Sequence, residues 1–348
     1  MPYATGRRIA GFLPRLSVGL GLLNALDWQG LQAQQRSAVT VSGLAYAQYD
    51  YRLSDTARGN AFDLTRAYLT VLGRPSDNVA TRFTADIYRS ADGFIAYRVK
   101  YAYAAYSPPG TGLTAKLGAI QTPWLDWEEA LWDYRMQGPM ALDRAGYLSS
   151  ADLGLGVDAS AGGGRIEAQV ALVNGENDNK PPGDRHKDLM GRISVRLLRT
   201  DDASRTGGLR LTGYGQLGTP TGGGVRDRLA GMLSYRSELL TLAAEVARTR
   251  DAAGSPSPPV TAGSVLSAFG VVKVPGSRLS LIARMDRIDP NTAARGDRTT
   301  RLIAGLAYQL APGLKLLGDL DHLVYEAIPT PAQAAQRSHA LFQIQFSF

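Results

Sequence analysis

The sequence predicts an all-β fold: a transmembrane antiparallel β-barrel of about 16 strands, with short turns at one rim and long loops at the other. Three observations predict it. Apolar and polar residues alternate with a period of two in many segments, which gives each segment one apolar and one polar face. The links between these segments alternate in length. After the N-terminus, no apolar stretch is long enough for a transmembrane helix.

The first 33 residues, 1–33, have the features of a signal peptide. Three arginines precede a short apolar core at residues 16–26, and residues 31–33 offer an imperfect cleavage site. An amphipathic N-terminal helix that is retained is the alternative. Because no change in composition marks a second domain, residues 34–348 are expected to form one barrel domain.

Sixteen segments have the strand pattern. They are 39–51, 62–73, 79–88, 95–107, 113–121, 153–161, 165–174, 189–198, 209–217, 228–236, 239–248, 265–274, 279–288, 301–310, 314–325 and 338–348. Short links rich in Gly and Pro alternate with longer polar links. Two links break this rule: 89–94 is short on the long side, and 201–208 is long on the short side. A soluble β-sandwich also has many short strands, but regular alternation of link lengths favours the barrel.

The last strand predicts how the barrel closes. Apolar residues, Phe342, Phe346 and Phe348 among them, occupy every second position of segment 338–348. A strand that ends on an aromatic residue resembles the closing strand of Gram-negative outer-membrane β-barrels. The resemblance implies that these three phenylalanines form an insertion signal that the barrel-assembly machinery recognises. It also implies an outer face in contact with outer-membrane lipid.

Several motifs resemble the phosphate-selective porin O/P-like family. They are 62–73 (FDLTRAYLTVLG), 116–124 (KLGAIQTPW), 143–146 (DRAG) followed by 153–157 (LGLGV), and 171–176 (ALVNGE). The resemblance covers the first half of the barrel and the last strand. It implies a 16-stranded, homotrimeric, water-filled channel in the outer membrane of a Gram-negative bacterium. Short turns would then lie in the periplasm and long loops outside the cell, and small ionic or polar solutes would diffuse through.

Ten basic residues on the polar faces are expected to line the pore. They are Arg66, Arg82, Arg98, Lys100, Lys116, Arg192, Arg196, Arg210, Arg284 and Arg301. A charge on the lipid face near mid-membrane costs about 2–4 kcal/mol, so inward placement is expected. Fewer acidic residues, such as Glu245 and Asp286, share that face. The basic excess predicts a weak anion preference. It does not predict phosphate specificity, because Lys is scarce.

The longest link, 122–152, follows the fifth strand and is expected to form a constriction loop. Its candidate residues are Trp124, Asp126, Trp127, Glu128, Glu129, Trp132, Asp133 and Arg135. Trp127, Leu131 and Tyr134 have helical spacing, and a helix is predicted to begin at Thr122-Pro123. Aromatic residues would brace the loop on the wall while carboxylates face the pore. The alternative is that the loop packs at the rim or against another subunit. If the acidic loop lines the narrowest point, its negative charge would offset the anion preference of the basic wall.

Composition and motif content narrow the chemistry. The chain has no Cys and three His, so disulfides, thiol catalysis, metal sites and cofactors are not expected. No basic helix with interleaved aromatic residues predicts nucleic-acid binding. A barrel enzyme is a rival, since His322 lies near Asp319 and Asp321, but these aspartates have the opposite phase and no Gly-x-Ser-x-Gly motif supplies a nucleophile. No enzyme activity is therefore predicted. A plugged structural or adhesive barrel remains a further alternative.

Overall fold

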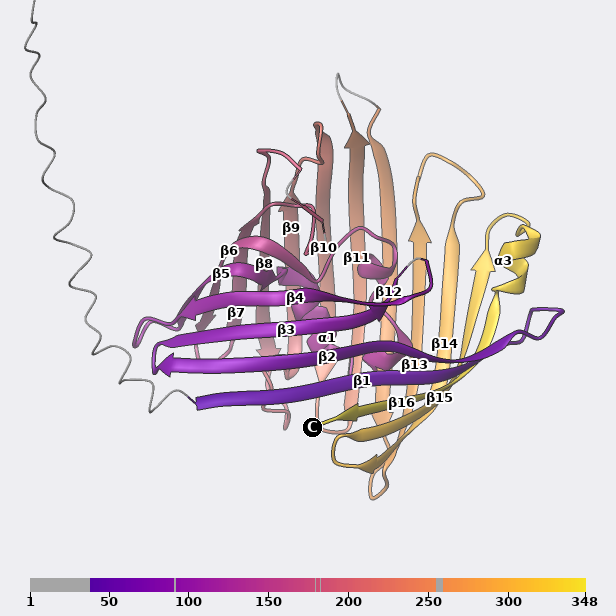
Figure 1. Cartoon of the computed structure of the whole chain (residues 1–348), viewed down its shortest axis with the longest axis horizontal. Helices are drawn as coiled ribbons and strands as arrows, with labels where there is room; N and C mark the ends of the chain where they lie inside the picture. The colour runs from indigo at the N-terminus through magenta and orange to yellow at the C-terminus, as the bar shows by residue number, and fades with distance from the viewer. Residues whose placement is uncertain (1–37, 91, 179, 182, 255–258) are drawn as a thin grey trace, which may run out of the picture.

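The computed structural model describes residues 38–348 except 91, 179, 182 and 255–258. The described chain forms a closed barrel of 16 antiparallel strands in which each strand pairs with its neighbours in sequence. The first and last strands lie side by side and close the ring (Figure 1). The predicted fold class is therefore confirmed, while the predicted signal peptide lies outside the described residues.

Every predicted strand is present, with ends that differ by a few residues. The strands are β1 (Ala38–Arg52), β2 (Asn60–Ser76), β3 (Val79–Arg89), β4 (Ile95–Tyr106), β5 (Leu113–Gln121), β6 (Ala151–Ala161), β7 (Ile166–Val173), β8 (Asp188–Leu198), β9 (Gly208–Leu217), β10 (Gly224–Arg236), β11 (Leu240–Ala253), β12 (Thr261–Lys273), β13 (Leu279–Asp289), β14 (Thr299–Ala311), β15 (Leu314–Tyr325) and β16 (Ser338–Ser347). The largest difference is the hairpin of β10 and β11, where Gly224 pairs with Ala253. Continued pairing across a hairpin satisfies backbone groups that a loop would leave to water.

The two rims of the barrel carry links of different length. Links that follow even-numbered strands form the turn rim, and links that follow odd-numbered strands form the loop rim. The link 77–78 has two residues, whereas 122–150 runs between β5 and β6. This second link is shorter than the predicted 122–152 because Ala151 and Asp152 pair in β6 with β5.

The period-two pattern separates two environments across the wall. On β11, Ala243, Glu245 and Ala247 face inward and are buried, whereas Leu242 and Val246 face outward and are exposed. Exposed apolar side chains on the other strands form a continuous outer surface of the same kind. Such a surface is stable only against an apolar medium, as in a lipid bilayer.

The seam between β1 and β16 ends at the C-terminal residue. Gly43 and Phe348 exchange two backbone hydrogen bonds, at 3.0 and 3.1 Å. A Cβ at position 43 would lie 2.3 Å from Cζ of Phe348, so the glycine makes room for the ring. Phe342, Phe346 and Phe348 all face outward, with exposed side chains. Their role as an insertion signal stays a prediction.

Helices are few and short. They are α1 (Pro123–Leu131), the 3₁₀ turn η2 (Arg135–Gln137), α2 (Ala141–Arg144) and α3 (Pro331–Ala335). No helix of the described chain is both long and apolar enough to cross a membrane. The link 122–150, which contains α1, η2 and α2, is called the third loop below. Its helices contact strands β7, β8, β12 and β16, and the apolar core of the protein lies between this loop and the wall.

Candidate functional site: polar cavities between the third loop and the wall

The predicted helix of the third loop is present. It begins with Pro123 in its first turn, where the missing N–H of proline costs nothing, and Thr122 precedes it in an extended conformation. Asp126 lies in the first turn, where a carboxylate interacts favourably with the helix dipole. The helix ends at Leu131, and Trp132 leaves the helical conformation.

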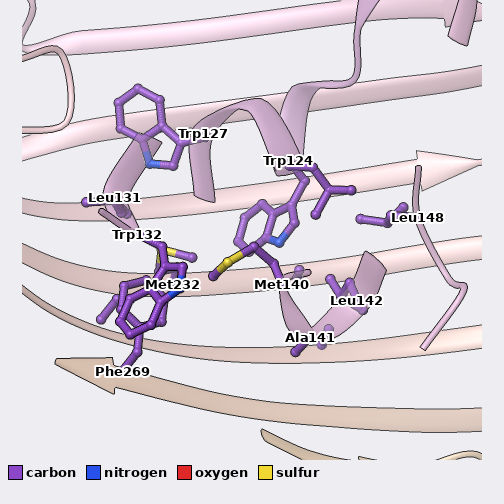
Figure 2. Packing of buried hydrophobic residues seen from close by; sticks show 14 of the residues in the cluster. Trp124, Trp127, Leu131, Trp132, Met140, Ala141, Leu142, Leu148, Met232 and Phe269 are labelled. Atoms are coloured by element: carbon purple, nitrogen blue, oxygen red, sulfur yellow. The ribbon is translucent and has the colours of Figure 1, made fainter. Parts of the chain in front are cut away.

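Aromatic side chains fix the loop inside the barrel. Trp124, Trp127 and Trp132 are almost completely buried. Figure 2 shows Trp132 beside Met232 and Phe269, and Trp124 beside Met140. The ring centroids of Trp132 and Phe269 are 5.1 Å apart in an edge-to-face arrangement. Large aromatic side chains bury about 150–250 Å² each, so these contacts dominate the docking of the loop. These contacts hold the loop against inward-facing side chains of the wall, and its role as a constriction stays a prediction.

Inward arginines on the far wall hold the same loop. Arg192 of β8 donates from Nε to the Pro123 carbonyl at 3.0 Å, and its guanidinium lies 4.3 Å from the Trp127 ring centroid. Arg284 of β13 is paired with Asp286 at 2.7 Å, and neither side chain is exposed. Arg192 and Arg284 face inward, as the phase predicted, but the docked loop covers them. They do not line an open passage.

The wall formed by β2, β3 and β4 remains uncovered and basic. Arg66 and Arg98 flank the buried Asp86, with Nε–Oδ distances of 3.3 and 2.9 Å. Lys100 donates to the Tyr68 hydroxyl at 3.3 Å. The Arg82 guanidinium lies 4.4 Å from the centroid of the Tyr101 ring. Asp178, from the link after β7, lies 3.4 Å from Arg98 Nε and adds a second carboxylate. Four cations therefore face two carboxylates, and the positive charge remains in excess.

Two polar cavities lie along this wall. One, of about 380 Å³, is bounded by Arg82 and Lys100 of the wall and by Asp126 and Glu129 of α1. The other, of about 580 Å³, lies between the wall and the links of the loop rim. Lys100 borders both cavities. Lys100 is therefore the side chain that the two cavities share, between the basic wall and the third loop.

The predicted carboxylates of the loop have different positions. Asp126 and Glu129 border the smaller cavity, and Glu129 is paired with Arg135 at 2.7 Å. Asp133 is paired with Arg236 of β10 at 3.0 Å. Glu128 does not face the pore, contrary to what was expected of the loop carboxylates. It is fully buried on the wall side of α1.

Glu128 lies in an environment that opposes its ionisation. Burial, followed by the nearby carboxyl of Glu245 on β11, raises the pKa of Glu128 well above its ordinary value. Within the described residues, neither carboxyl accepts a hydrogen bond from a donor group. A proton shared between the two carboxyls would satisfy both of them.

The other basic residues predicted for the pore lie away from the two cavities. Lys116 is paired with Asp158, and Arg301 with Asp321. Arg196 and Arg210 donate to turn carbonyls, to Gly163 at 2.8 Å and to Gly164 at 2.7 Å respectively. Of the ten residues, the structure places Arg66, Arg82, Arg98 and Lys100 at the cavities.

Sequence reasoning missed two arginines of the site. Arg205 lies in the link between β8 and β9 and borders the smaller cavity. Arg236 contacts the end of α1 through the Ala130 and Leu131 carbonyls. The alternation of residues along β10 places the Arg236 side chain inward, and this pattern could have predicted its contact with the loop. For Arg205 the only signal was the unusual length of its link.

No family model matches the sequence, and no curated protein matches it. Solved structures do match the fold. OmpT of Vibrio cholerae, expressed in the outer membrane, has a TM-score of 0.63 at 12% identity, over 90% of this chain and 98% of that chain. OmpF of Salmonella typhi, in complex with daunomycin, has a TM-score of 0.64 at 12% identity, over 89% and 97%. A mutant of the Rh. blastica porin has a TM-score of 0.55 at 15% identity, over 89% and 100%. The chain therefore has the fold of outer-membrane porin barrels.

Proposed function

We propose that this protein is a porin of a Gram-negative outer membrane, a passive diffusion channel for small hydrophilic solutes and ions. The observation that carries the proposal is the pair of polar cavities that meet at Lys100, between the basic wall and α1. Passive diffusion needs a hydrated path of limited width with no tight site, and charged side chains border both cavities. The fold shared with outer-membrane porins supports the same reading.

Opposed charges at the smaller cavity would act on passing solutes. Arg82 and Lys100 lie on one side of the smaller cavity, and Asp126 and Glu129 lie on the other. A transverse field of this kind orients dipolar solutes and weights ions by sign. Since Asp126 and Glu129 each have an arginine partner, we propose a weak preference for anions. Phosphate preference would need a further feature that the wall does not supply.

The assembly we propose is a homotrimer in lipid. One solved structure of Vibrio cholerae OmpT is described as a trimer form. The exposed apolar surface of the strands would contact lipid and neighbouring subunits. Contact with the barrel-assembly machinery through Phe342, Phe346 and Phe348 is part of the same proposal.

Conductance of the purified, refolded protein in a planar lipid bilayer tests the proposal. We expect discrete conductance steps and a reversal potential, under a salt gradient, that favours anions weakly. A reversal potential of the opposite sign would mean that the loop carboxylates dominate. Correctly folded protein without conductance would reject the channel and leave the plugged barrel.

One contact favours a barrel enzyme as the second candidate. His322 Nδ1 lies 2.7 Å from Ser338 Oγ on the outer face. The acidic partner of a triad is on the other side of the wall, since Asp319 and Asp321 face inward and His339 pairs with Asp50 there. We therefore propose no enzyme activity. Ester hydrolysis by the folded protein that Ser338→Ala abolishes would reverse this view.

A further inference from the structure

The turn between β8 and β9 differs from the other turns at its rim. It has nine residues, 199–207, whereas the others have two to six. Two residues are enough to join antiparallel strands, so closing the barrel does not require this length. The additional residues need another explanation.

This turn contacts α1 inside the barrel. Arg205 donates from Nη2 to the Asp126 carbonyl at 2.7 Å, and its Nη1 lies 2.8 Å from Asp126 Oδ2. Its guanidinium carbon lies 5.6 Å from the centroid of the Trp127 ring. These contacts hold a positive charge beside the first turn of α1, where Arg205 borders the smaller cavity.

A second arginine ties the same turn to the far end of α1. Arg236 donates to Asp202 Oδ2 of the turn at 2.9 Å and to Asp133 Oδ1 of the third loop at 3.0 Å. The turn is itself ordered, because the backbone N–H of Ser204 donates to Asp202 Oδ1 at 2.7 Å. The turn and α1 are therefore held together at both ends of the helix.

We propose that the turn 199–207 is a second constriction element, inserted from the turn rim, and that Arg205 is a specificity-determining residue of the passage. The inference rests on the proposed channel function. Without the Arg205 charge, Asp126 would lose its counter-ion at the edge of the cavity. A unit charge at this range changes the local concentration of an ion about twofold, so Arg205 should favour anions by that factor.

The chain has no cysteine, so Arg205→Cys introduces a single thiol. The variant is compared with the unaltered full chain by its reversal potential in a planar bilayer. We expect a shift toward cations, by about twofold in the permeability ratio. A positively charged methanethiosulfonate reagent should restore the original value, and a negatively charged reagent should increase the shift. A residue that only supports the fold would not respond to the sign of the reagent.

Arg199→Cys is the matched control. Arg199 lies in the same turn, is exposed, and makes no hydrogen bond to α1 within the described residues. Neither reagent should change the reversal potential there. If Arg205→Cys does not fold, Asp126→Asn tests the same pair and should shift the channel toward anions.

The outcomes separate the two proposals. A folded wild-type chain without conductance removes both. If the wild type conducts but neither reagent changes the reversal potential of Arg205→Cys, the inference fails and the channel stands. Equal responses at positions 199 and 205 would also overturn it, because the effect would then come from the rim and not from the constriction.

Discussion

The two sides of the third loop differ in what surrounds similar residues. Toward β8–β13, Arg284 and Asp286 form a pair without solvent exposure beneath Trp132. Toward β2–β4, Arg98 and Asp86 form a similar pair at 2.9 Å, but the Arg98 side chain is 19% exposed at a cavity. Both arginines face inward from strands of the same pattern. The comparison teaches that a residue can face the lumen without lining a cavity. Whether it does so depends on whether the third loop covers it.

The largest effect should come from the covered side. Arg284→Met leaves Asp286 buried without its cation, and we expect a loss of about 3–5 kcal/mol in the free energy of unfolding. Arg98→Met should cost less, because Asp86 keeps Arg66 and the Arg98 side chain is itself partly exposed, although Asp178 loses its ion pair with Arg98. Urea unfolding in lipid vesicles, followed by tryptophan emission, measures both. Equal losses would contradict the distinction between the two sides.

A smaller, pH-dependent effect should come from Glu128. Its pKa is raised by burial and then by Glu245, while Arg284 acts in the opposite direction. The docked loop therefore favours the protonated form. The free energy of unfolding is therefore greatest below pH 4.5, the ordinary pKa of Glu128. It decreases as pH rises toward the raised pKa of Glu128, by about 1.4 kcal/mol per pH unit in that window.

Tryptophan emission can follow this transition, since three of the four Trp lie in the loop. Glu128→Gln should weaken the pH dependence, and Glu128→Gln combined with Glu245→Gln should remove it. Glu129→Gln, on the cavity side of the same helix, should retain it in full. A pH dependence unchanged in the double variant would assign the effect to another group.

The smallest effect on stability should come from the open wall. Neutralising Arg82, Arg98 and Lys100 together, each to Gln, should shift the reversal potential toward cations. The free energy of unfolding should change little at Arg82 and Arg98, because partly exposed charges contribute about 0–1 kcal/mol each. The buried Lys100 donates to the Tyr68 hydroxyl and has no ion-pair partner among the described residues, so its loss leaves no carboxylate unpaired. Arg295→Gln, on an exposed link of the loop rim, is the control. Unchanged ion selectivity in the triple variant would rule out the wall as a selectivity determinant.

Much of the fold could be predicted from the sequence because the wall has only two environments. Alternation with a period of two places Leu242 outside and Glu245 inside without any knowledge of contacts. The start of α1 could also be predicted, because its signal consists of two adjacent residues, Thr122 and Pro123. Which inward residues are covered could not be predicted, because it depends on distant contacts. Met140 and Arg284, for example, are in contact although 144 positions separate them in the sequence.

The seam between Gly43 and Phe348 has a consequence for folding. Strands β1 and β16 pair over nine residues, from Leu44 with Ser347 to Arg52 with His339, and nearly the whole chain lies between them. Until this pairing forms, the nascent sheet has two open edges that can pair with other chains. Contacts between such distant residues form slowly, because loop entropy is lost before they contribute. The ring therefore becomes complete only when β16 pairs with β1, and the unfinished sheet is the species most exposed to aggregation.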